Sequence, residues 1–217
     1  MNQKKLYWHD RQACTVVIEA LKQGNVVAGT TDTVLGLLAD TTREGFGRLD
    51  QIKGRVHKPY LILIGAPNNV RHFVSFPLAD SVQRIIDACW PGPLTIIFKA
   101  KPGLPPHLVA LDGTIALRMP DHAGLLAILE YFNGLYSTSA NFAGEPVAAT
   151  VDQLDPRILA SVAHLIVDDE QSDSIKKSSS MDLPASLPST IIDCTGDEVV
   201  IVREGAFTRA MLSNILE

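Results

Sequence analysis

The chain has 217 residues, a net charge of −5, 46% hydrophobic residues and 20% charged residues. This length and composition predict one globular domain whose core is large enough to form without disulfides. The negative charge argues against a general polyanion-binding protein, which would normally be basic. The chain shows neither a signal peptide nor a run of about 18 apolar residues, so we expect a cytoplasmic protein without a membrane segment.

Short apolar runs alternate with amphipathic patterns through the first half of the chain. Four runs have the length and composition of buried strands: Val26–Ala28, Val34–Leu38, Leu61–Ile64 and Leu94–Phe98. Three segments have the spacing of helices that bury one face: 13–21, 46–52 and 78–89. Asp10 is placed to cap the first helix, and the polar turn Thr30–Thr33 separates the first two strands.

The second half of the chain continues this alternation. Four more strands are predicted: Ile115–Arg118, Leu165–Val167, Thr190–Ile192 and Val199–Val202. We expect one helix capped by Asp121 and a closing helix at Phe207–Leu216, with Ser137–Asn141 as a small polar segment. Residues 168–186 are rich in Ser, Asp and Lys, and we expect a mobile surface loop there. The mixture predicts a single α/β domain over residues 1–217 with a mixed sheet.

Two interpretations fit Lys53-Gly54-Arg55. Cations at the end of a helix favour the helix dipole, and as surface groups they are ordinary there. Alternatively, Arg55 offers a planar pair of donors and Lys53 a mobile charge, which together suit a phosphate clamp. The chain has no GxxxxGK[ST] loop and no GxGxxG motif, so a nucleotide would need a different cradle.

Arg118 ends a predicted buried strand and needs an anionic partner, because an unpaired buried guanidinium is costly. The partner is either Asp32, Asp121, or a carboxylate or phosphate of a substrate. The hydroxyl groups of Thr30–Thr33 and of Ser137–Asn141 fit ordinary turns or an anion-binding nest. We interpret Trp90-Pro91-Gly92-Pro93-Leu94-Thr95 as structural, because Pro and Gly fix a turn and Trp supplies packing area.

The order of these motifs along the chain resembles that of the YrdC family. The matching segments are TTDTVLGL at 30–37, KGR at 53–55, WPGPLT at 90–95, RMPDH at 118–122, STSANFAGEP at 137–146, STIID at 189–193 and REG at 203–205. Several positions depart from the family pattern: Thr30 replaces the usual Pro, Leu35 the usual Tyr, and Ile64 a His, and VHKPYL at 56–61 stands where RPxxKPL is usual. An apolar residue at position 64 is similar to the shorter, TsaC-type members.

The resemblance implies a fold and an activity. The fold is an α/β twisted open mixed sheet with flanking helices and a concave ligand groove. The activity is that of a nucleotidyltransferase that makes threonylcarbamoyl-AMP from L-threonine, bicarbonate or CO2, and ATP, and releases pyrophosphate. The product serves the formation of threonylcarbamoyladenosine in tRNA, so tRNA and the downstream threonylcarbamoyl-transfer proteins are candidate partners. Mg2+ is expected to accompany ATP rather than to be held by protein ligands alone.

The resemblance also implies roles for residues at the matched positions. Lys53, Arg55 and Arg118 are the expected catalytic groups. The expected ATP-binding residues are Lys53, Arg55, Thr138, Ser139, Ala140, Asn141, Thr150 and Arg203. The expected threonine-binding residues are Thr31, Thr33, Arg118 and Ser189. No ligand role is assigned to His57 or His122.

Two other functions remain open at this point. One is a YrdC-like paralogue that makes another carbamoyl-adenylate. The other is a non-catalytic RNA-binding module, since a cationic groove can bind the phosphates of RNA. The net charge of −5 and the lack of a basic stripe with interleaved aromatic residues argue against the RNA-binding module.

Overall fold

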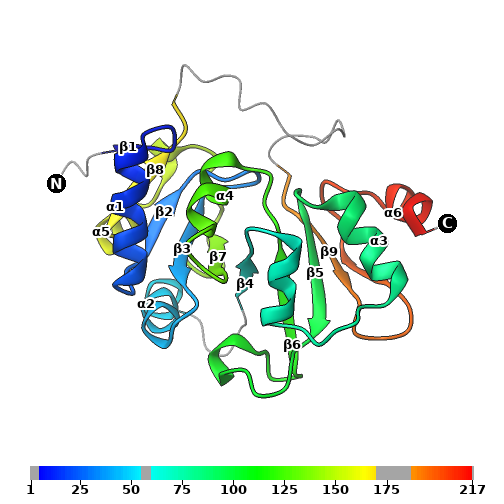
Figure 1. The fold of residues 1–217 in the computed structure, drawn as a ribbon. Helices are drawn as coiled ribbons and strands as arrows, with labels where there is room; N and C mark the ends of the chain where they lie inside the picture. The colour runs from blue at the N-terminus through cyan, green and yellow to red at the C-terminus, as the bar shows by residue number, and fades with distance from the viewer. Residues whose placement is uncertain (1–4, 55–59, 170–186, 217) are drawn as a thin grey trace.

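The computed structural model describes residues 5–54, 60–169 and 187–216. Ten strands in these residues form one open sheet in the order β1-β8-β2-β3-β7-β4-β6-β5-β9-β10 (Figure 1). Their bounds are β1 Lys5–Tyr7, β2 Val27–Gly29, β3 Gly36–Asp40, β4 Leu61–Leu63, β5 Leu94–Lys99, β6 Thr114–Arg118, β7 Leu135–Ser139, β8 His164–Val167, β9 Thr190–Asp193 and β10 Val200–Arg203. The sheet contains both parallel and antiparallel pairs, which confirms the predicted mixed α/β architecture.

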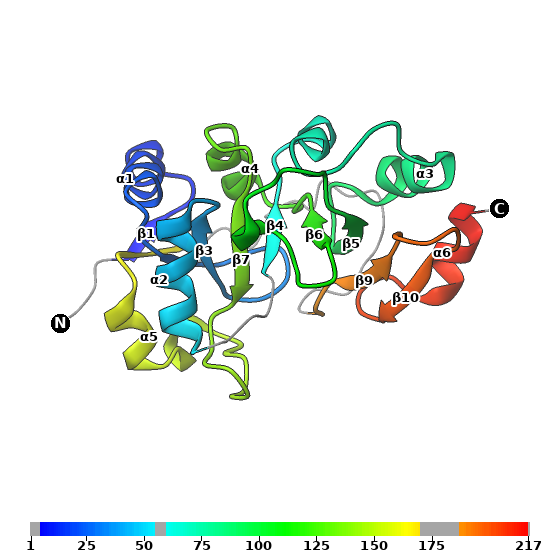
Figure 2. The same ribbon diagram turned by 90° about the horizontal axis from the view of Figure 1, so that it is seen from below.

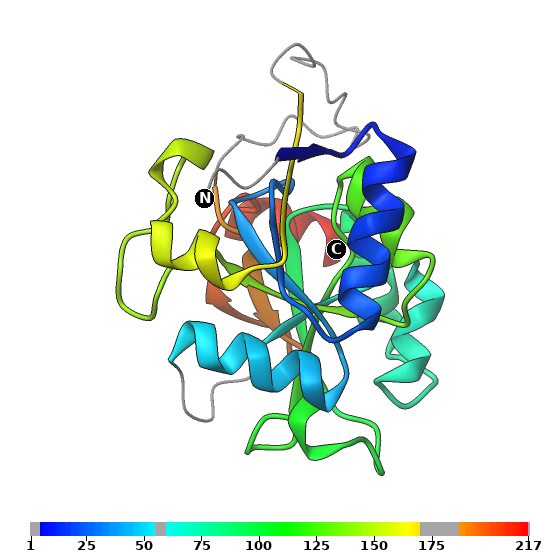
Figure 3. The same cartoon turned by 90° about the vertical axis from the view of Figure 1, so that its left-hand side faces the viewer.

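Helices flank this sheet on both sides. Their bounds are α1 Arg11–Lys22, α2 Arg43–Lys53, α3 Asp80–Cys89, α4 Ala123–Leu129, α5 Pro156–Ser161 and α6 Arg209–Leu216, with 3-10 turns at Pro67–His72, Pro106–Leu108 and Val151–Gln153. Figure 2 shows α1 and α4 on one side of the strands and α2 and α5 on the other. Figure 3 shows the same separation of α1 from α2 and α5 at the end of the sheet that holds β1 and β8. Helices α3 and α6 pack together near the other end.

The core is divided between the two sides of the sheet. One cluster joins α1 and α4 to the sheet through fully buried side chains such as Val17, Leu125 and Ile166. The larger cluster extends from α2 and α5 to α3 and includes Leu49, Ile158 and Ile86. Burial of apolar area on both sides is the main stabilising term of such a layered fold. It fixes the strand register, because a shift by one residue would expose a whole face.

Local chemistry explains where several elements begin and end. Asp10 caps α1 as predicted, because its Oδ1 accepts a hydrogen bond of 2.8 Å from the Gln12 N–H. Strand β3 begins at Gly36, two residues later than predicted. The Thr31 hydroxyl accounts for this shift, since it donates to the Val34 carbonyl at 2.7 Å and holds Val34 in the preceding turn.

Two sequence-based assignments were wrong. Residues 135–139 form β7, a central strand, although Ser137–Asn141 was described only as a small polar segment and no strand was predicted there. The strand forms because Leu135 and Tyr136 bury their side chains on opposite sides of it. The cap of α4 is His122 and not Asp121, whose N–H donates instead to Asp32.

Two short elements were missed. Strand β1 has three residues and pairs in parallel with β8, far away in the sequence. Helix α5 has six residues, with Asp155 as its cap and Pro156 at its first position. Both are too short to give a periodic pattern.

The predicted loop at 168–186 lies outside the described residues apart from Asp168 and Asp169. The assignment of residues 1–217 to one domain stays a prediction. No helix in the described part of the chain has both the length and the hydrophobicity needed to cross a bilayer.

Candidate functional site

A cavity of about 460 Å³ lies against the central strands of the sheet. Alternate residues of β5 and β6 face this cavity: Thr95 and Ile97, then Ala116 and Arg118. The residues between them, such as Ile96 and Leu117, point into the core. The alternation follows from the two-residue repeat of a β-strand. The sheet therefore supplies a rigid floor for a ligand.

Most of the predicted site residues meet at this cavity. Those that line it are Thr31, Thr33, Arg118, Thr138, Ser139, Ser189 and Arg203. Four others, Lys53, Ala140, Asn141 and Thr150, are not among its lining residues. Arg55 lies outside the described residues, as do His57 and Lys58. The turn at 31–33, the end of β7 and the start of β9 thus converge, although they are far apart in the sequence.

Arg118 is buried at the end of β6, and its anionic partner is Asp32. Arg118 Nη2 lies 2.8 Å from Asp32 Oδ1, and the two side chains are only 3% and 7% exposed. Arg118 Nη1 also donates to the Thr33 hydroxyl at 3.3 Å. Among the described residues, the buried Nε–H of Arg118 has no hydrogen-bond acceptor. An unused donor on a buried cation at a cavity wall suits an anionic ligand group.

The turn before β3 is held by its own hydroxyl groups. Thr31 Oγ1 accepts from the backbone N–H groups of Thr33 and Val34, at 3.1 and 3.2 Å. It also lies 3.2 Å from the Thr33 hydroxyl. Ordinary turn chemistry therefore explains Thr31, and the same bonds present Thr33 to the cavity and to Arg118.

Arg203 forms a second cationic group on the cavity wall. Its Nη2 donates to the Ser189 carbonyl at 2.7 Å, and the Ser189 hydroxyl lies 2.9 Å from the hydroxyl of Thr95. Burial lowers the pKa of Arg203, and repulsion from Arg118 lowers it further. Two guanidinium groups and no carboxylate line the described part of the cavity. Its electrostatics favour an anionic ligand.

Thr95 is a lining residue that the sequence analysis missed, because its segment was interpreted as structural. Period-two alternation was the available signal: Leu94 and Ile96 are buried, so Thr95 must face the opposite side. Tyr60 was also missed. It lines the cavity and donates its hydroxyl to Asp50 Oδ1 at 2.9 Å.

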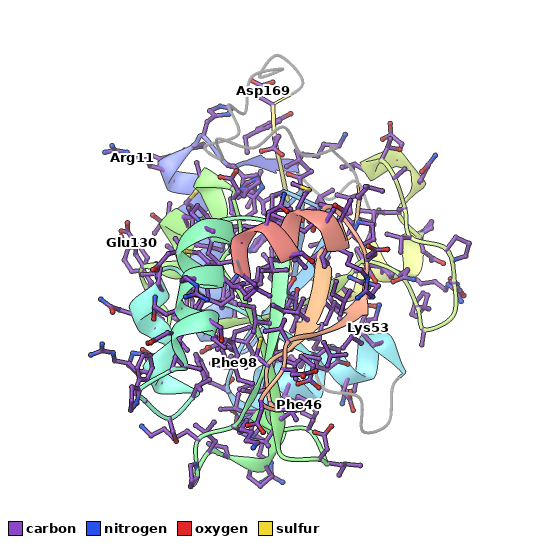
Figure 4. All side chains as sticks on the ribbon, turned by 90° about the vertical axis from the view of Figure 1, so that its right-hand side faces the viewer. Arg11, Phe46, Lys53, Phe98, Glu130 and Asp169 are labelled. Atoms are coloured by element: carbon purple, nitrogen blue, oxygen red, sulfur yellow. The ribbon has the colours of Figure 1, made fainter. Side chains whose placement is uncertain are left out.

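Lys53 is not the surface cation that its place at a helix end suggested. It closes α2, as the view with labelled side chains shows (Figure 4), and is only 1% exposed. Its Nζ donates to the Ser139 carbonyl at 2.7 Å, to Asn141 Oδ1 at 2.9 Å and to the Asn141 carbonyl. Lys53 therefore ties the end of α2 to the segment that follows β7.

That segment is further braced by Asn141. Its Oδ1 also accepts from the Ser139 hydroxyl at 2.6 Å, and its amide donates to the Glu145 carbonyl at 2.5 Å. Ser139, Ala140 and Asn141 are thereby held next to the cavity. In the described residues, no group of three or more His, Cys, Asp and Glu side chains lies close enough to hold a metal ion.

The fold and the site together define a class: α/β proteins with one open mixed sheet and a polar, cationic cavity at its centre. The model of the Sua5/YciO/YrdC family, described as "Telomere recombination", matches residues 19–205. The chain belongs to this family.

Named relatives and solved structures agree with the family assignment. A Methanocaldococcus jannaschii protein is 34% identical over 209 residues, which cover 93% of this chain and 91% of the relative. The threonylcarbamoyl-AMP synthase of Shigella flexneri is 34% identical over 146 residues, which cover 65% of this chain and 77% of the relative.

Two crystal structures share the fold. Pyrococcus abyssi (P. abyssi) Sua5 complexed with L-threonine aligns with a TM-score of 0.82 and 21% identity over 97% of this chain. The chain spans only 59% of the length of that Sua5 protein. Escherichia coli (E. coli) YciO aligns with a TM-score of 0.76 and 21% identity, over 95% of this chain and 97% of its own.

Proposed function

We propose that the protein is a threonylcarbamoyl-AMP synthase, which joins L-threonine, bicarbonate and ATP and releases pyrophosphate. A relative that bears this name matches this chain at 34% identity, and residues from every matched motif except KGR line one cavity. The product is a mixed anhydride of a carbamate and AMP, and it serves the modification of tRNA. The enzyme is a nucleotidyltransferase.

The main support for the proposal comes from the hydrogen-bonding groups of Arg118. Asp32 and Thr33 occupy its two terminal nitrogens, while its buried Nε–H has no acceptor among the described residues. The cavity beside it is lined by hydroxyl groups and by a second arginine, Arg203. A small amino acid with a carboxylate and a hydroxyl group fits this chemistry. Thr31, Thr33, Arg118 and Ser189 are the proposed threonine-binding residues.

ATP is proposed to bind on the Ser139 side of the cavity. The proposed contacts are Lys53, Arg55, Thr138, Ser139, Ala140, Asn141, Thr150 and Arg203, with Mg2+ bound together with the triphosphate. The Lys53 ammonium already contacts Ser139 and Asn141, so its contribution includes shaping this segment. Cations placed around phosphates stabilise the charge that develops during phosphoryl transfer.

The reaction needs little covalent help from the protein. The threonine amine and bicarbonate form a carbamate with loss of water, and a carbamate oxygen then attacks the α-phosphorus of ATP. The bond from the α-phosphorus to the bridging oxygen breaks, and pyrophosphate leaves with that oxygen. Holding the two substrates in line supplies most of the acceleration. Lys53, Arg55 and Arg118 are the proposed catalytic groups.

The test uses purified protein, ATP, Mg2+, radiolabelled bicarbonate and each amino acid in turn. We expect pyrophosphate release that depends on both threonine and bicarbonate, together with a labelled adenylate that can be isolated by chromatography. Turnover with serine or another amino acid but not with threonine would reject the substrate. Absence of turnover with every amino acid, combined with RNA binding that weakens steeply with salt, would indicate the non-catalytic alternative.

A further inference from the structure

Both ring nitrogens of His122 lie close to polar groups of other residues, but only Nδ1 makes a hydrogen bond. The residue is 3% exposed, and its Nδ1 accepts the Leu125 N–H at 3.1 Å as the cap of α4. Because Nδ1 is an acceptor, the proton of the neutral ring is on Nε2. Nε2 lies 3.2 Å from Asp168 Oδ1 without being well aligned for a hydrogen bond, so this contact is mainly electrostatic.

Asp168 is fixed in turn at the end of β8. Its N–H donates to the Thr30 hydroxyl at 3.0 Å, and the same hydroxyl accepts the indole N–H of Trp8 at 3.1 Å. The Trp8 ring stands edge-on to His122 with centroids 5.2 Å apart. Burial acts to raise the pKa of Asp168, but its polar contacts with the His122 ring and the Thr30 hydroxyl outweigh burial and hold the pKa below its ordinary value.

The residue next to His122 is linked to Arg118 through a shared carboxylate. The N–H of Asp121 donates to Asp32 Oδ2 at 3.0 Å, while Asp32 Oδ1 accepts from Arg118 at 2.8 Å. The two oxygens of Asp32 therefore bind two different groups, the Asp121 N–H and the Arg118 guanidinium. The orientation of the carboxylate sets that of the guanidinium. Neither His122 nor Asp168 is among the residues that line the cavity.

We infer that His122 and Asp168 are positioning residues that orient Arg118 for its substrate through Asp121 and Asp32. The inference rests on the proposed function, because it concerns how Arg118 meets threonine. Thr30 takes part as the hydroxyl that anchors Asp168. This gives a role to a residue that departs from the usual Pro of the family.

The test separates this role from simple capping of α4. The variant His122→Asn keeps a side-chain oxygen for the Leu125 N–H but cannot reach Asp168. We expect the KM for threonine to rise about tenfold, because small displacements of a positioned group weaken binding strongly, while the KM for ATP stays unchanged. Asp168→Asn should act in the same direction. The double variant should be no worse than the more affected single variant, because both changes break one chain of contacts.

The matched control is Asp10→Ala, which removes the exposed cap of α1. It should lower the melting temperature without changing the KM for threonine. A lower melting temperature in His122→Asn with an unchanged KM for threonine would overturn the inference while leaving the proposed function intact. If His122→Asn does not fold, Asp168→Asn decides by the same measurement. If the wild-type protein shows no threonine-dependent turnover, the proposed function fails and the inference falls with it.

Discussion

Arg118 forms a buried ion pair and also lines the proposed threonine site, so its substitution should affect both stability and turnover. The sequence alone did not decide which anionic group pairs with Arg118. In the structure the partner is Asp32, whose Oδ1 lies 2.8 Å from Arg118 Nη2. A substitution therefore removes half of a buried ion pair as well as a proposed substrate contact.

We expect Arg118→Ala to lower the free energy of unfolding by about 3–5 kcal/mol, since it leaves Asp32 buried without its partner. Arg118→Lys should stay folded but lose at least about 100-fold in turnover, because an ammonium cannot reproduce the planar donors. Urea unfolding and pyrophosphate release measure the two effects. Arg84→Lys, on the exposed surface of α3, is the control and should change neither. Full turnover in Arg118→Lys would remove Arg118 from the proposed threonine site.

Lys53 differs from an ordinary lysine at a helix end. Lys53→Ala should cost roughly 1.5–3 kcal/mol of stability, because it leaves carbonyl groups of Ser139 and Asn141 without a charged donor, and it should also weaken ATP binding. Lys22, in the last turn of α1, is exposed and serves as the matched control. Lys22→Ala should cost less than about 1 kcal/mol. Calorimetry with ATP and thermal melts distinguish the two variants. Equal ATP affinity in both would contradict the nucleotide role of Lys53.

At the scale of elements, the contacts of Asp168 at the end of β8 should make the stability of the protein depend on pH. The folded pKa of Asp168 is depressed, so its contribution to stability is present above the unfolded value of about 4. This contribution is lost as the pH falls through the folded pKa. Asp168→Asn should therefore narrow the difference in unfolding free energy between pH 7 and pH 3. Denaturant titrations at the two pH values measure it. An unchanged difference would mean that the carboxylate is equally solvated in both states.

The elements also show how far sequence reasoning extends. Strands such as Leu94–Lys99 were predictable because apolar residues mark them directly. Strand β7 was not, because Ser137 and Ser139 point to the cavity and remove the apolar signal from one side of the strand. The family resemblance predicted seven of the lining residues, among them Arg118 and Ser189, and did not predict others such as Thr95 and Tyr60. The burial of Lys53 and the pairing of Arg118 with Asp32 depend on tertiary contacts, and no local pattern encodes them.

At the scale of the whole molecule, the rate at which the cysteine thiols are alkylated indicates whether the protein is folded. Burial raises the pKa of both Cys89 and Cys194 to about 12, and that of Cys14 is also raised. Because thiolates are the reactive form, we expect slow alkylation of the native protein at pH 8 and fast reaction of all three cysteines in denaturant. Mass spectrometry after timed iodoacetamide treatment would show this. Rapid native labelling of Cys89 would mean that α3 opens readily.

The strand order has a consequence for biosynthesis. Strand β7 is the only described strand that joins β3 to β4, so it connects the two halves of the sheet. On the ribosome, β3 can pair with β2 as soon as both have emerged, but at about 5–20 residues per second its other edge stays open for several seconds until β7 is made. Likewise, β1 and the second edge of β2 remain unpaired until β8 emerges. A nascent chain that stops before Leu135 exposes unpaired strand edges, so it should depend on chaperones and be prone to aggregation.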